Sequence, residues 1–64
     1  MMSNNLHNLM AQLVQENKSL WRIRDVYLND AEGEEDCLNF WKEMEADKQK
    51  HIEALQALIK SHLN

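Results

Sequence analysis

Apolar residues recur at intervals of three and four along two long stretches of the chain, a spacing typical of amphipathic α-helices. The first stretch carries one such row, made of Leu6, Leu9, Leu13, Leu20, Ile23 and Tyr27. The second carries another, made of Cys37, Trp41, Met44, Leu55 and Leu58, with the polar His62 at its end. The pattern predicts an all-α protein with one helix from about residue 4 to 28 and a second from about residue 34 to 62.

The residues between and before these stretches predict where the helices begin and end. The only glycine, Gly33, lies in the segment NDAEGEED, and the chain has no proline. Ser3 is placed to cap the first helix, and the acidic residues at 34–36 suit the positive end of the second helix dipole. We therefore expect a turn at about 29–33 and a single antiparallel helical hairpin covering residues 1–64.

Each predicted helix also has a second apolar row beside the first. These rows comprise Met10, Val14, Trp21 and Leu28, and Leu38, Ile52, Ile59 and Leu63. One row on each helix can close the hairpin, but the other would stay exposed on a monomer, and a chain of 64 residues buries only about 60% of its unfolded surface. The pattern predicts a homodimer or higher oligomer in which two hairpins form a four-helix bundle. The expected dimer interface is Met10, Val14, Trp21, Ile52 and Ile59.

Three polar residues interrupt the rows at the same level of the predicted hairpin. If the turn is centred near residue 32, facing residues have numbers that add up to about 64. This rule places Glu16 opposite Lys48, and Leu13 opposite His51, so Glu16, Lys48 and His51 form a buried polar layer. One interpretation is an ion pair that fixes the register of the helices. The other is a metal site, in which Glu45 or Asp47 would join Glu16 and His51.

The same residues resemble those of the ferritin-like and rubrerythrin-like di-iron proteins, in which one helix supplies a Glu and the next an E-x-x-H motif. Glu16 corresponds to the first, and KQKH, from Lys48 to His51, stands where E-x-x-H would be. The resemblance implies half of a four-helix bundle, completed by a two-fold dimer, and an iron site with Glu16 and His51 as ligands. Lys48 replaces the bridging Glu, which implies that the metal site has lapsed.

Composition narrows the functions further. Eleven acidic residues against seven basic ones give a net charge of −4, which argues against a nucleic-acid surface, although small RNA-binding helical hairpins have a similar plan. No apolar run is long enough to cross a membrane. Cys37 is the only cysteine, and an unpaired thiol without a signal sequence suits a cytoplasmic protein.

No catalytic arrangement emerges from the sequence. No hydroxyl or thiol nucleophile has a histidine base on its own helix face, and no glycine-rich loop is present to bind phosphate. The sequence therefore predicts a noncatalytic, dimeric structural or interaction module without a cofactor. The alternative is an iron-binding protein whose site forms between two chains.

Overall fold

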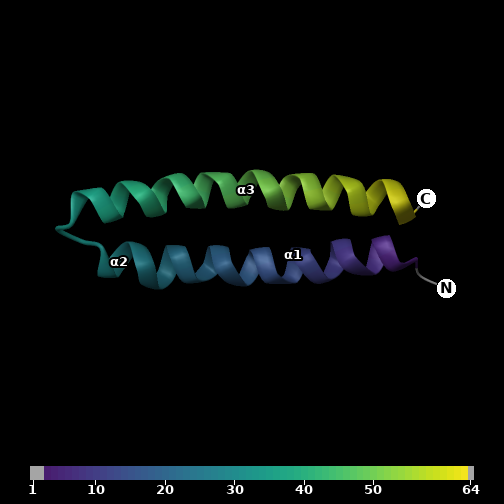
Figure 1. Cartoon of the computed structure of the whole chain (residues 1–64), viewed down its shortest axis with the longest axis horizontal. Coiled ribbons are helices and arrows are strands. Elements are labelled where there is room, and N and C mark those ends of the chain that lie inside the picture. Colours follow the sequence, from purple (N-terminus) through teal and green to yellow (C-terminus); the bar gives the residue numbers. More distant parts are fainter. Residues whose placement is uncertain (1–2, 64) are drawn as a thin grey trace.

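The computed structural model describes residues 3–63, and every regular element in that range is helical. The first helical run consists of α1 (Asn4–Arg22), a π-helical turn η1 (Ile23–Tyr27) and a short α2 (Leu28–Asp30), and the second is α3 (Glu35–Leu63). The chain reverses at residues 31–34, so the two runs lie side by side and both termini are at the same end of the molecule (Figure 1). The resulting hairpin measures 49 × 15 × 13 Å.

The capping residues explain where the helices begin. The Ser3 hydroxyl accepts a hydrogen bond of 3.1 Å from the Leu6 N–H, which satisfies one of the N–H groups left open at the start of α1. Asp36, in the first turn of α3, accepts a bond of 2.8 Å from the Cys37 N–H and places negative charge at the positive end of that helix. In the turn, Gly33 adopts a φ of 88°, a left-handed conformation that other residues adopt at a cost.

The helix bounds lie close to those expected from the sequence. The first run continues to Asp30 rather than ending near residue 28, while α3 begins at Glu35 and ends at Leu63. The π-helical turn is a feature that the pattern did not predict, because its apolar spacing does not differ from that of an α-helix. The N–H of Leu28, the residue directly after this turn, donates to the carbonyl of Ile23. The Ile23 side chain is 1% exposed.

The π-helical turn coincides with a change in which residues face each other across the hairpin. By the rule that the numbers of facing residues add up to about 64, Tyr27 should face Cys37. Instead the Tyr27 ring lies against Trp41, with ring centroids 4.7 Å apart, and Cys37 is exposed. A π turn holds more residues than an α turn, so it offsets the residues that follow it from those that precede it. The rule that the numbers of facing residues add up to about 64 therefore does not hold near the turn.

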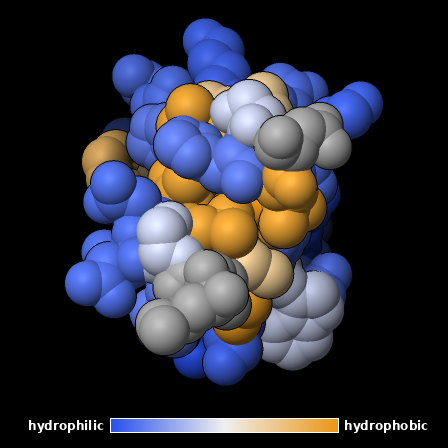
Figure 2. Space-filling view, turned by 90° about the vertical axis from the view of Figure 1, so that its right-hand side faces the viewer, coloured by the Kyte–Doolittle hydropathy of each residue, from blue (hydrophilic) through white to orange (hydrophobic). Residues whose placement is uncertain are grey.

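The hydrophobic core is a narrow seam between the two runs. Its buried apolar residues are Leu6, Leu20, Ile23, Ala31, Ile52 and Ile59. Viewed from the end that carries the termini, hydrophobic side chains occupy the middle of the molecule and hydrophilic ones surround them (Figure 2). Burying these side chains supplies most of the free energy that stabilises a hairpin of this kind.

The core corrects the predicted role of two residues on α3. Ile52 and Ile59 were expected in a dimer interface, but they are 4% and 9% exposed and pack within the hairpin itself. His51 and Leu58, which the sequence placed facing α1, are exposed instead. The seam on α3 therefore combines both rows, because Lys48 and Leu55 of the first row are half-buried beside Ile52 and Ile59 of the second.

Candidate functional site

Glu16 is the only charged residue buried among those that the structure describes, with 9% of its surface exposed. The Lys48 Nζ lies 3.4 Å from Glu16 Oε2 and 3.5 Å from Oε1. The side chains of Glu16 and Lys48 are 12% and 17% exposed, so water screens this ion pair less than it would a surface pair. The structure thus brings together the two residues that the facing rule paired.

Two further side chains complete the polar layer around the Glu16 carboxylate. Gln12, one helical turn earlier, donates a hydrogen bond of 3.0 Å from Nε2 to Glu16 Oε1. His51 places its Nδ1 3.6 Å from Glu16 Oε2, but its side chain is 65% exposed. His51 therefore lies at the edge of the seam, whereas the sequence placed it inside, opposite Leu13. We use "polar layer" below for Gln12, Glu16, Lys48 and His51.

The surroundings of Glu16 act on its pKa in opposite directions. Burial raises the pKa, because the charged form loses hydration. The Lys48 ammonium, together with hydrogen bonds from Lys48, Gln12 and His51, favours the charged form and outweighs burial. The net result is a Glu16 pKa below its ordinary value of 4.5, so the carboxylate is ionised at neutral pH and contributes to stability in that form.

Glu16→Ala is expected to lower the free energy of unfolding at neutral pH by about 2 kcal/mol, between the values typical of exposed and of fully buried ion pairs. The variant leaves the Lys48 ammonium in the seam without its carboxylate. Because the folded-state pKa of Glu16 is lowered, its contribution is complete above pH 4.5 and is lost as the pH falls through that pKa. Urea unfolding of both proteins at neutral and at acid pH should show the difference between them shrinking in acid.

Glu53→Ala is the matched control, since Glu53 is an exposed glutamate on α3. It should change the free energy of unfolding by less than about 0.5 kcal/mol, as is usual at surface positions. Equal effects of the two substitutions would show that the Glu16–Lys48 pair does not stabilise the hairpin.

A second ion pair, nearer the turn, joins the two helical runs. Arg24 Nε lies 2.8 Å from Glu45 Oε2, and Arg24 Nη2 donates to Gln49 Oε1 at 3.3 Å. This pair was not predicted from the sequence, where Glu45 was considered only as a metal ligand. The signal available was the spacing of Glu45 and Gln49, which lie one turn apart on the same side of α3. With 49% of the Arg24 side chain exposed, such a pair contributes little to stability.

The polar layer does not have the composition of a metal site within one chain. Among residues 3–63, no three His, Cys, Asp or Glu side chains gather closely enough to hold an ion. Glu16 and His51 do lie together, but the Lys48 ammonium contacts both oxygens of the carboxylate and would repel a cation. Glu45, one of the further ligands considered from sequence, is engaged by Arg24 instead.

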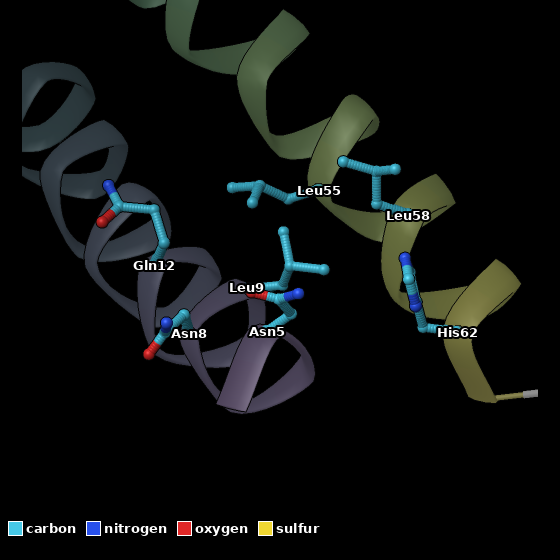
Figure 3. Close-up of a pocket in the computed structure, with 7 residues that line it drawn as sticks. All are labelled: Asn5, Asn8, Leu9, Gln12, Leu55, Leu58 and His62. Atoms are coloured by element: carbon cyan, nitrogen blue, oxygen red, sulfur yellow. The ribbon is translucent and has the colours of Figure 1, made fainter. Parts of the chain in front are cut away.

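A shallow groove runs along one side of the hairpin, next to the polar layer. One part of it is lined by Gln12, Glu16, His51, Ala54, Leu55 and Leu58. The adjoining part is lined by Asn5, Asn8, Leu9, Gln12, Leu55, Leu58 and His62 (Figure 3). In this part Leu9 and Leu55 extend toward each other from the two helices, forming the floor between them (Figure 3). We call the whole depression the lateral groove.

The large apolar side chains that remain exposed lie on two different sides of the hairpin. They are Met10, Val14, Trp21, Val26, Phe40, Met44, Leu58 and Leu63. Trp21 follows Gln12 by nine residues, or about two and a half helical turns, so it lies on the side of α1 away from the lateral groove. Met10 and Val14 precede Trp21 by eleven and seven residues, close to three and two full helical turns, so all three lie on the same side of α1. The exposure of these three residues agrees with the predicted second row on the first helix.

The predicted dimer interface is therefore wrong as a single surface. Met10, Val14 and Trp21 are exposed, but Ile52 and Ile59 are buried inside the hairpin and cannot contact a second chain without unfolding. Along its middle, α3 instead exposes three large apolar side chains that were not predicted for the interface, Phe40, Met44 and Leu58. Any interface on that part of α3 must use this set.

Comparison with known proteins returned no match, either to protein-family models, to curated proteins or to solved structures. The resemblance to di-iron proteins thus rests on Glu16 and on the segment from Lys48 to His51 alone. Within residues 3–63, no helix combines the length and the apolar character needed to cross a membrane.

Proposed function

We propose that this protein is a noncatalytic interaction module, an antiparallel helical hairpin that pairs with a second copy to form a four-helix bundle. The observation that carries the proposal is the amount of apolar surface left uncovered. Eight large apolar side chains are exposed, against six apolar residues that are buried in the described part of the chain. Large apolar side chains that share one side of a helix, as Met10, Val14 and Trp21 do, are typical of a surface that another chain covers.

The shape of the hairpin supports the same proposal. Two helices in contact have one seam between them, and the molecule around that seam measures only 15 × 13 Å along its two shorter axes. A domain with so small a core needs a further source of stability, which disulfides, metals or oligomerisation usually supply. Cys37 is the only cysteine, and the polar layer of the described chain is unsuited to a metal, which favours oligomerisation.

The surroundings of the exposed Cys37 thiol do not activate it as a nucleophile. Repulsion from Asp36, some loss of hydration, and the charge of Glu34 all raise the pKa of the Cys37 thiol. A raised pKa keeps the sulfur protonated at neutral pH, and the protonated thiol is a poor nucleophile.

One observation favours a second candidate, an iron-binding protein with a site between two chains. The Glu16 carboxylate and the His51 imidazole lie 3.6 Å apart, and His51 is accessible from outside. A second hairpin could bring an equivalent pair to the same level, as the ferritin-like resemblance implies. The Lys48 ammonium would repel a metal ion beside Glu16, so the variant Lys48→Glu tests the iron-binding candidate directly.

The proposed association is tested by analytical ultracentrifugation, with circular dichroism recorded over the same range of concentration. We expect a dimer at micromolar concentration, and a loss of helicity on dilution as the dimer dissociates, because the isolated hairpin is marginally stable. A monomer that retains full helicity at every concentration would contradict the proposal.

A further inference from the structure

We infer that the second copy docks on α3, along a row of exposed residues that is complementary to itself. This inference rests on the proposed self-association and specifies the surface that carries it. The row, which we call the α3 strip, consists of Phe40, Met44, Asp47, His51, Ala54 and Leu58. All six residues are exposed in the hairpin, and three of them, His51, Ala54 and Leu58, line the lateral groove.

The intervals between successive members of the α3 strip are the same whether they are counted from its first residue or from its last. Its members alternate at intervals of four and three residues, so they lie on one side of the helix, as in a coiled-coil seam. The sequence of intervals is symmetric about residue 49. If two copies of α3 pack antiparallel around a two-fold axis at that point, each member of the strip meets its counterpart from the other copy.

The residues paired by this symmetry are chemically complementary. Phe40 meets Leu58 of the second copy and Met44 meets Ala54, so apolar residues meet apolar residues toward both ends. At the centre, Asp47 meets His51 of the second copy, an acid opposite a base. A two-fold axis produces each contact twice. Every row with this alternation is symmetric in spacing, so we assign the strip to a second copy because of the chemical match, above all the acid that meets a base at its centre.

The geometry of His51 is suited to the central contact. Its Nδ1 faces the Glu16 carboxylate at 3.6 Å, inside its own hairpin. The Nε2, on the opposite edge of the ring, is then directed away from that carboxylate, and the side chain as a whole is 65% exposed. In its imidazolium form, His51 has a proton on each nitrogen and can donate to Glu16 through Nδ1 and to Asp47 of the second copy through Nε2. Each imidazolium then joins the polar layer of one chain to the carboxylate of the other.

The lateral groove provides a hole for a side chain of the second copy. His51, Ala54, Leu55 and Leu58 line it on α3, at the spacing of the four residues that form a hole in knobs-into-holes packing. Ala54 is the smallest of the four and leaves the space that the partner's side chain needs. The symmetry of the strip places Met44 of the second copy opposite Ala54, and an unbranched methionine adapts readily to such a depression.

Disulfide cross-linking tests this arrangement. The strip variant carries Met44→Cys and Ala54→Cys, with Cys37→Ser to remove the native thiol. The two introduced thiols are ten residues apart on one helix, or about 15 Å, which is beyond the reach of a disulfide within one chain. The inferred dimer brings position 44 of each chain next to position 54 of the second copy, so mild oxidation should convert most of the protein to a covalent dimer on non-reducing gels.

A matched control carries Ala46→Cys and Gln56→Cys in the same Cys37→Ser background. These positions are also exposed and ten residues apart on α3, but they are outside the α3 strip. Cross-linking of the strip variant with little in the control would support the inference. Equal cross-linking of both would overturn it. A protein that sediments as a dimer without cross-linking at the strip would overturn the inference and leave the proposed association intact, and a helical monomer would overturn both.

Discussion

Ile52→Asp is expected to unfold the hairpin. Ile52 is 4% exposed and packs in the seam between α3 and the first helical run. The substitution removes a large apolar side chain from the core and places a carboxylate there, where the nearest cation on the same helix face, Lys48, is already paired with Glu16. We expect a loss of about 4 kcal/mol or more, comparable to the entire stability of a domain of this size. Circular dichroism should show most of the helical signal lost at room temperature.

Ala57→Asp provides the control, because it introduces the same carboxylate at an exposed position on the same helix. This variant should keep its helicity and its thermal midpoint within a few degrees of wild type. An Ile52→Asp variant that keeps its helicity would contradict the burial of Ile52 in the seam described above.

Lys48→Glu is expected to destabilise the hairpin by about 2–4 kcal/mol at neutral pH, because it replaces the cation beside Glu16 with a second carboxylate. Two carboxylates in one partly buried layer repel each other and raise each other's pKa. A carboxylate whose pKa is raised in the folded state destabilises that state when it is ionised. The stability of the variant should therefore recover as the pH falls, whereas the Glu16–Lys48 pair of the wild type weakens in acid.

The same variant tests the resemblance to di-iron proteins. The inferred two-fold axis near residue 49 of α3 would place the two polar layers at the same level, so the Lys48→Glu dimer would offer four carboxylates and two histidines there. Fe(II), Mn(II) or Zn(II) should then restore stability, by about 2.7 kcal/mol at a hundredfold excess over the dissociation constant. Thermal unfolding with and without each metal measures this effect.

Lys50→Glu is the control for both parts of this prediction, since Lys50 is an exposed lysine on α3 and, two residues after Lys48, points to a different side of the helix. It should be close to wild type in stability and should not respond to metal. A Lys48→Glu variant that is indifferent to metal would contradict the idea of a lapsed site. A wild type that metal strongly stabilises would favour the iron-binding alternative over the noncatalytic module.

Local features of the sequence determined the secondary structure and one contact of the candidate site. The three- and four-residue spacing of apolar residues, the cap at Ser3 and the single glycine at position 33 predicted two helices and the turn between them. Each of these signals acts over a few residues, so it can be interpreted without knowing the rest of the fold. The pairing of Glu16 with Lys48 followed from the length of the helices and the position of the turn.

The rotation of the helices about their own axes was decided only by the tertiary structure. Two apolar rows one residue apart on α3 both have helical spacing, and the choice between Ile52 and His51 as the buried member depends on how the side chains of both helices fit together. The π-helical turn at Ile23–Tyr27, which accompanies a change in the facing residues near the turn, has no distinct sequence spacing. The sequence therefore determined that two amphipathic helices form and pair, and packing between residues far apart in the chain decided which apolar residues stay exposed.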